Sequence, residues 1–304
     1  MPRLRDLLNK IRGSKKKDNV VCEKKEKAVR RKRHDFVFGE DDALESIIAH
    51  LENDIATGEW INTLYGKVDL KMMPALVKQA NEKYPQMELK FSATPEDIPK
   101  LIRNTIDNGI QSSRVIVNLG GNKIHFSVID HKTVDKKTSL ILFESVAFKH
   151  MEPAVLAMRA KIALEESQLP NYYFSMVEMD IQRSASECAI FSLALAKKLY
   201  TQSDKLGRLH KDNVDGILSK QDALFVSPNQ LDSYLPVTFY KHVQGVNRLN
   251  EYIKSNPRAK KEIVNKNGEN IYKRFNKNSV VMDNKDVSVS SHKKRIREYK
   301  SLLR

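Results

Sequence analysis

One cysteine lies where a nucleophile is expected. Residues 174–200 begin with the pattern of a strand and end as a helix, with Phe191 and Leu195 at helical spacing. A polar turn at residues 182–186 lies between them and contains two serines that can cap the helix. This places Cys188 in the first helical turn, where free backbone N–H groups and the helix dipole favour a thiolate. The alternative is a buried cysteine that packs as a small hydrophobic residue.

A histidine and a glutamate upstream favour the nucleophile interpretation. Residues 124–130 and 138–144 alternate between apolar and polar types as strands do, and the short polar segment between them predicts a hairpin. If the turn is centred near Val134, His125 and Glu144 fall close to opposite positions. A carboxylate beside an imidazole fixes its tautomer and raises its basicity, so the pair can activate a cysteine.

A glutamine and an arginine precede the cysteine on the same turn. The side-chain amide of Gln182 can donate to a developing oxyanion, and with the cysteine, histidine and glutamate it predicts acyl transfer through a thioester. A water acceptor would make the protein a protease or isopeptidase, whereas a protein hydroxyl or amine would make it a transferase. A coenzyme A donor carries phosphates and needs cations near the cysteine. Arg183 can be such a cation, or simply a surface charge on a turn.

Several segments together resemble the YopJ family of bacterial type III effectors, within the ubiquitin-like-protease clan of cysteine enzymes. They are VNLGGNKIHFSVID, KTSLILFE, FSMVEMDIQRSASECAIFSLALAKKLY, LPVTFYKH and SHKKRIREYKSLL, and the resemblance covers about residues 45–304. Ala189 follows the cysteine where many members of the clan have glycine. The resemblance implies an α/β fold of the α+β kind. A cysteine-protease-like core with a mixed sheet and helices is joined by a helical regulatory part from the N- and C-terminal segments.

The resemblance also implies a function. It describes an acetyltransferase, secreted by the type III system into the host cytoplasm, that moves acetyl from acetyl-CoA through an acetyl-cysteine to Ser, Thr or Lys of host signalling kinases. MAP kinase kinases are the leading substrates, because an acetylated activation-loop hydroxyl cannot be phosphorylated. The implied roles are a general base for His125, its orientation by Glu144, the nucleophile for Cys188, oxyanion contact by Gln182, and cofactor contact by Arg183, Ser184 and His125. Two alternatives remain open, a cysteine protease of ubiquitin-like conjugates and a non-catalytic protein with a vestigial site.

Positive charge is concentrated at the two ends of the chain. The net charge is +15; residues 1–34 carry 14 Lys and Arg against 4 Asp and Glu, and residues 241–304 carry 17 against 6. If the C-terminal cations converge, they predict a polyanion ligand. The resemblance implies inositol hexakisphosphate as an activator, bound by Lys197, Lys198, Lys241, His242, Lys273, Arg274, Lys293 and Lys294. Alternatively, Lys197 and Lys198 are ordinary cations that interact with the dipole at the end of a helix. Nucleic acid is the other possible polyanion, although no interleaved aromatic stripe supports it.

The organisation that we expect has three segments. Residues 1–38 form a disordered basic segment for secretion and targeting, residues 39–203 the catalytic core, and residues 204–304 a basic regulatory region that packs on the core. Residues 1–17 could be a short amphipathic helix in transient contact with an anionic membrane, or a disordered leader. Residues 30–33 could be a nuclear-import patch or a solvated charge run.

Composition and periodicity complete the expectations. The two cysteines, Cys22 and Cys188, indicate neither a disulfide framework nor a metal site, and a reducing compartment suits a free thiolate. No apolar run reaches the length of a membrane span. The other elements that we expect are helices at 42–57, 72–82, 153–166, 235–252 and 291–303, strands at 87–92 and 114–119, and a hairpin over 263–275.

Overall fold

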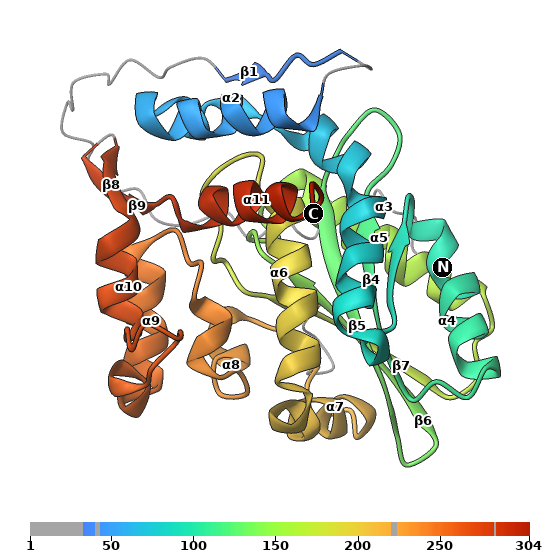
Figure 1. Ribbon diagram of the computed structural model, residues 1–304. Helices are drawn as coiled ribbons and strands as arrows, with labels where there is room; N and C mark the ends of the chain where they lie inside the picture. Colours follow the sequence, from blue (N-terminus) through green and yellow to red (C-terminus); the bar gives the residue numbers. More distant parts are fainter. Residues whose placement is uncertain (1–32, 40–42, 220–223, 283) are drawn as a thin grey trace, which may run out of the picture.

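A five-stranded mixed sheet forms the centre of the molecule (Figure 1). The computed structural model describes residues 33–39, 43–219, 224–282 and 284–304. The strand order is β3-β4-β5-β6-β7, with β3 (Leu89–Ser92), β4 (Ser112–Asn118), β5 (Phe126–Val134), β6 (Lys137–Glu144) and β7 (Tyr172–Glu178). The three middle strands are antiparallel, whereas β3 and β7 pair in parallel at the edges. The mixed sheet and its helices confirm the predicted α/β class.

Helices cover both faces of the sheet. Because side chains alternate along β4, Ile116 packs into one apolar cluster and its neighbours Val115 and Val117 into a second. The first cluster includes α3 (Gly66–Lys83) and α6 (Cys188–Thr201), and the second includes α4 (Ile98–Asp107) and α5 (Met151–Glu166). Helix α6 is therefore a core helix, and it holds the start of the expected nucleophile helix in a fixed position.

The β5–β6 hairpin has a different register from the one that we expected. Its turn is formed by Asp135 and Lys136, both with positive φ (49° and 64°), and the strands extend through most of the segment expected to be a loop. Val128 pairs with Phe143, so the continued register places Glu144 opposite Ser127 instead of His125. The histidine is two positions further along, and a shift of two residues keeps a side chain on the same face of the sheet.

The C-terminal region packs against α6 and against the sheet. Its elements are α7 (Gly207–Val214), α8 (Pro228–Leu231), α9 (Val246–Ser255), α10 (Ile271–Asn278), the hairpin β8 (Ser279–Met282)–β9 (Lys285–Ser288), and α11 (Ser290–Ser301). Helix α11 packs against α2 (Leu44–Thr57) and also contacts α3 and α6 (Figure 1). The last helix is thus packed against both the first described helix and the expected nucleophile helix.

Two C-terminal expectations were wrong. Residues 235–252 form a 3-10 turn, Val237–Tyr240, and the separate helix α9, because the segment between them is held by the hydrogen bond from Gln244 N–H to the Ile181 carbonyl. The turn at Gly268 closes only one bridge, between Ile263 and Asn270, and the chain then enters α10. The hairpin β8–β9 was not predicted.

Short elements complete the described chain. They are β1 (His34–Asp35), β2 (Thr63–Leu64), and 3-10 turns at Glu59–Ile61, Pro85–Met87, Pro95–Asp97, Ser203–Leu206 and Pro257–Lys261. No helix among the described residues is long and apolar enough to cross a membrane. Some expectations concern residues outside the described part of the chain. They are those for residues 1–17, for Cys22, and for most of segments 1–38 and 30–33.

Candidate active site

Cys188 is the first residue of α6, as predicted. The preceding residues 182–187, here called the catalytic turn, connect the β7 side of the sheet to this helix, and the cysteine is buried at 4% exposure. The two serines of the turn do not cap the helix, contrary to our expectation. Ser184 donates its hydroxyl to Glu187, and Ser186 donates its own to the carbonyl of Thr63 at 3.0 Å. The turn is therefore fixed by tertiary contacts on both sides.

His125 and Glu144 meet despite the changed register. Nε2 of His125 donates to Oε2 of Glu144 at 2.9 Å, and both side chains are buried. The carboxylate is held by two further donors, the Ser127 hydroxyl on the facing strand and the Val146 backbone N–H at 2.9 Å. The histidine backbone is fixed in turn by Asn118, whose Oδ1 accepts its N–H at 3.3 Å. Neither Ser127 nor Asn118 was predicted from the sequence.

The protonation of His125 depends on its two neighbours. Burial alone would lower its pKa, but the negative charge of Glu144 and the hydrogen-bonded Cys188 raise the pKa well above the usual value. Because Nε2 is engaged by the carboxylate, Nδ1 is the ring nitrogen left for the thiol. The three side chains are arranged to stabilise an imidazolium beside a thiolate, which is the reactive form of a catalytic cysteine.

The amide of Gln182 has a fixed orientation. Ser145 donates its hydroxyl to Oε1 at 2.9 Å, so Nε2 faces the catalytic turn and donates to the Ser184 carbonyl at 2.7 Å. One N–H of this amide group is used and the other remains available, as an oxyanion donor requires. Ser145 directly follows Glu144, so the end of β6 holds both the His125 imidazole and the Gln182 amide.

Arg183 and Ser184 lie in the wall of one cavity, here called the turn cavity, of about 1060 Å³. Arg183 pairs with Asp180 at 2.8 Å and is partly exposed, and Arg33 lines the same cavity. The exposed side chain of Val281 adds apolar surface. The hydroxyl of Ser184 points away from this cavity, because it bonds Glu187 and Gln244 in a buried polar network. The cations and apolar groups that line the cavity suit a ligand with phosphates and an apolar arm.

A second hollow, here called the cationic pocket, has a volume of about 840 Å³. Five of the eight residues predicted to bind a regulator line it: Lys197, Lys198, Lys241, His242 and Lys294. The other three do not. Arg274 lies behind the wall and donates to the Lys241 carbonyl at 3.0 Å, Lys293 bonds Asn278, and Lys273 follows the cap of α10. Four further cations of the pocket were not predicted from the sequence: Lys83, Lys266, Arg297 and Arg304.

The cationic pocket has the electrostatics of an anion site. Burial, together with repulsion from Arg274 and Lys198, lowers the pKa of Lys241 to about 8. Such mutual repulsion is relieved by a ligand with several negative charges. Within the described chain, the buried hydroxyl of Thr238 in the pocket wall has no hydrogen-bond partner, so it can donate to an anion.

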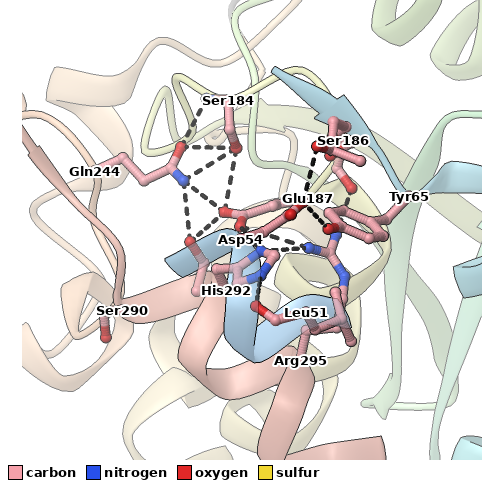
Figure 2. A network of polar contacts seen from close by, with 12 residues as sticks. Leu51, Asp54, Tyr65, Ser184, Ser186, Glu187, Gln244, Ser290, His292 and Arg295 are labelled. Carbon is pink, nitrogen blue, oxygen red and sulfur yellow. Dashed lines mark hydrogen bonds and ion pairs between the residues drawn. The ribbon is translucent and has the colours of Figure 1, made fainter. Parts of the chain in front are cut away.

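Beneath the catalytic turn, α11 takes part in a buried network of ionic and polar side chains (Figure 2). Arg295 forms a bidentate pair with Asp69 at 2.9 Å and also donates to the Ser186 carbonyl at 2.6 Å. Glu187 accepts from Ser291 and has both Arg295 and His292 close by. Burial would raise the pKa of Glu187, but these neighbours lower it, so a carboxylate lies directly before the cysteine.

A buried cysteine–histidine–glutamate set on a mixed α/β fold indicates an enzyme of the class that works through an acyl-cysteine. A family model described as YopJ serine/threonine acetyltransferase matches residues 44–301, and the chain belongs to this family. The serine/threonine-protein acetyltransferases YopJ of Yersinia pestis and of Yersinia pseudotuberculosis are each 54% identical to it over 264 residues, 87% of this chain and 91% of theirs. The resemblance seen in the sequence is thereby confirmed.

Solved structures agree with this assignment. The structure of AvrA delL154 with IP6 and CoA is 50% identical, has a TM-score of 0.82, and matches 86% of this chain and 97% of its own. The structure of HopZ1a in complex with IP6 and CoA is 18% identical, has a TM-score of 0.71, and matches 87% of this chain and 93% of its own. At this identity HopZ1a supports the fold alone.

Proposed function

We propose that the protein is a type III secreted effector that acetylates Ser or Thr of host signalling kinases, with acetyl-CoA as donor. MAP kinase kinases are the leading substrates, and Lys is a further acceptor. The observation that carries the proposal is the buried pair of His125 and Glu144 beside Cys188, in a chain of this family. Acetylation of an activation-loop hydroxyl would block its phosphorylation in the host cytoplasm and keep the kinase inactive.

The site supports a two-step transfer. His125 takes the proton of Cys188, and the thiolate attacks the acetyl carbonyl while Gln182 donates to the oxyanion. The coenzyme A thiolate leaves and takes the proton from the imidazolium. In the second step His125 removes the proton of the acceptor hydroxyl, the hydroxyl oxygen attacks the acetyl-cysteine, and the cysteine thiolate leaves and regains a proton. Glu144 keeps Nε2 protonated throughout, so that Nδ1 is the nitrogen that exchanges protons.

The two hollows suit two ligands of different kinds, one for each. The AvrA structure contains IP6 and CoA. We assign coenzyme A to the turn cavity, where Arg183 lies beside the catalytic turn, and inositol hexakisphosphate to the cationic pocket as an activator. Eight Lys and Arg side chains line that pocket, among them Lys198 and Lys241, enough to contact every phosphate of such a ligand.

Labelled acetyl-CoA tests the proposal. The full chain, inositol hexakisphosphate and candidate kinases are incubated together, and acetylated sites are mapped by mass spectrometry, with Cys188→Ala as the control. We expect label on kinase Ser or Thr residues, only with the active chain. Release of free acetate without labelled protein, together with cleavage of ubiquitin-like conjugates, would instead favour the cysteine protease.

A further inference from the structure

One buried glutamine holds both ends of the catalytic turn. Oε1 of Gln244 accepts the backbone N–H group of Arg183 at 2.5 Å and that of Ser184 at 2.8 Å. Figure 2 shows the Gln244 side chain between Ser184 and Glu187. Its Nε2 donates to Glu187 at 2.5 Å and lies 3.0 Å from the Ser291 hydroxyl. A single side chain thus bonds the start of the turn, next to the oxyanion donor, and its end, next to the cysteine.

The same glutamine follows the wall of the cationic pocket closely along the chain. Lys241 and His242 line the pocket two or three residues before it. Its backbone N–H donates to the carbonyl of Ile181, another residue of the pocket wall, at 2.9 Å, and its carbonyl accepts from Ser288. The segment 241–244 therefore connects lysine and histidine side chains of the pocket wall to a side chain that bonds both ends of the catalytic turn, and it has no helical or strand bonds of its own.

Charge acts on this segment from the pocket side. Lys241 faces Lys198, Lys294 and Arg297 across the pocket, while Arg274 holds its carbonyl from behind. Without an anion, these cations repel Lys241 and favour its displacement from the others. An anion that contacts several of them at once removes this force and fixes the position of the segment.

We propose that Gln244 is a positioning residue that couples the cationic pocket to the catalytic turn: when an anion fixes Lys241, Gln244 fixes the N–H groups of the turn and the carboxylate before Cys188. This inference rests on the proposed function and names the contact through which the activator acts. If the inference holds, a change of the Gln244 side chain should leave anion binding at the cationic pocket intact and remove the effect of the anion on Cys188.

The test compares wild type with Gln244→Met, which keeps the length of the side chain and removes its hydrogen bonds. Inositol hexakisphosphate is the probe. Its affinity is measured by calorimetry, and its effect is measured as the stimulation of acetylation kcat and of Cys188 alkylation by iodoacetamide. We expect an affinity within about threefold of wild type and a stimulation at least about tenfold smaller, since two buried N–H groups lose their acceptor and the Glu187 carboxylate loses one of its donors.

Tyr252→Phe is the matched control. It also removes one buried hydrogen bond from the C-terminal region, to the Leu235 carbonyl, but makes no contact with the turn. It should lower the melting temperature and keep the full stimulation. Wild-type stimulation in Gln244→Met would overturn the proposal. So would an affinity that falls in parallel with the stimulation, because the glutamine would then only support the pocket wall.

A second variant, Gln244→Glu, tests the proposal if Gln244→Met does not fold. It keeps an acceptor for the two N–H groups and places a second carboxylate next to that of Glu187. Glu187 also contacts Ser291, His292 and Arg295 of α11. A proton shared by the two carboxylates restores the lost hydrogen bond. The stimulation of the variant, relative to that of wild type, should therefore increase when the pH is lowered from about 8 to about 6. A flat ratio contradicts the proposal. If wild type fails to acetylate any kinase, the proposed function is wrong, and the alkylation measurement still tests Gln244.

Discussion

Replacing Glu144 with Gln tests whether the charge beside His125 controls the cysteine. The carboxylate accepts from Nε2 of His125 and from Ser127 through one oxygen, and from the Val146 N–H through the other. An amide keeps one acceptor but places an N–H₂ group where a donor already points. Losing a charge-assisted hydrogen bond and leaving one buried donor unpaired costs about 2–3 kcal/mol. If the whole cost falls on the transition state, acetyl transfer slows about 30- to 150-fold.

The pKa of His125 reports the same change. With Glu144 neutral, burial outweighs the remaining effect of Cys188, so the pKa should fall. In wild type, His125 stays protonated at pH values above the usual histidine pKa. In the variant it loses its proton at a lower pH, and the stability contributed by the charged pair is lost there too. An NMR titration of the His125 ring and the pH profile of Cys188 alkylation both measure this shift.

Ser127→Ala separates the hydrogen bond from the charge. It removes one donor to Glu144 and leaves the carboxylate in place, so we expect a loss of about 1 kcal/mol, about fivefold in rate. A Glu144→Gln variant with wild-type transfer, or with an unchanged His125 pKa, would refute the reasoning. A larger loss in Ser127→Ala than in Glu144→Gln would show that orientation, not charge, is what the base needs.

Four further predictions concern other parts of the chain. Cys188→Ala should abolish transfer and keep the melting temperature, because a small buried side chain is replaced by a smaller one; residual transfer would contradict its role. Lys241→Ala should weaken inositol hexakisphosphate binding about 5- to 30-fold in calorimetry. In wild type the binding should tighten as the pH falls through about 8, where Lys241 gains its proton, and the variant should lack this dependence. Arg295→Met should lower the free energy of unfolding by about 3–5 kcal/mol in urea, because it leaves the buried Asp69 carboxylate without its cation. Deleting residues 1–32 should leave acetylation in vitro unchanged and impair secretion; a folded but inactive deletion variant would show that the segment takes part in the chemistry.

Local patterns were sufficient to predict the nucleophile unit and the hairpin. Cys188 begins its helix as predicted, and alternation along β5 and β6 placed His125 and Glu144 on one face of the sheet. The register was wrong because the turn is formed by Asp135 and Lys136 with positive φ. These residue types give a weaker turn signal than glycine or an Asn-Gly pair, so their position could not be read from composition.

Long-range contacts could not be read from the sequence. Ser127 donates to Glu144 and Ser145 donates to Gln182, yet serines on or next to strands carry no local signal for such contacts. The cationic pocket takes Lys83 from α3 and Arg297 from α11, elements that are more than two hundred residues apart in the chain. Clustered charge predicted a polyanion site, but only the packing of these helices determines which cations face it.

Helix α11 makes the C-terminal region inseparable from the candidate active site. One side of the helix carries Arg295 to the catalytic turn and to Asp69 of α3, and another side carries Lys294 and Arg297 into the cationic pocket. Removing the helix would leave Asp69 and Glu187 as buried carboxylates without a cation, each at a cost of several kcal/mol. The same cost opposes any motion of α11 away from the turn. An anion in the pocket can therefore act on the site more easily through small shifts of segments such as 241–244 than through release of the helix.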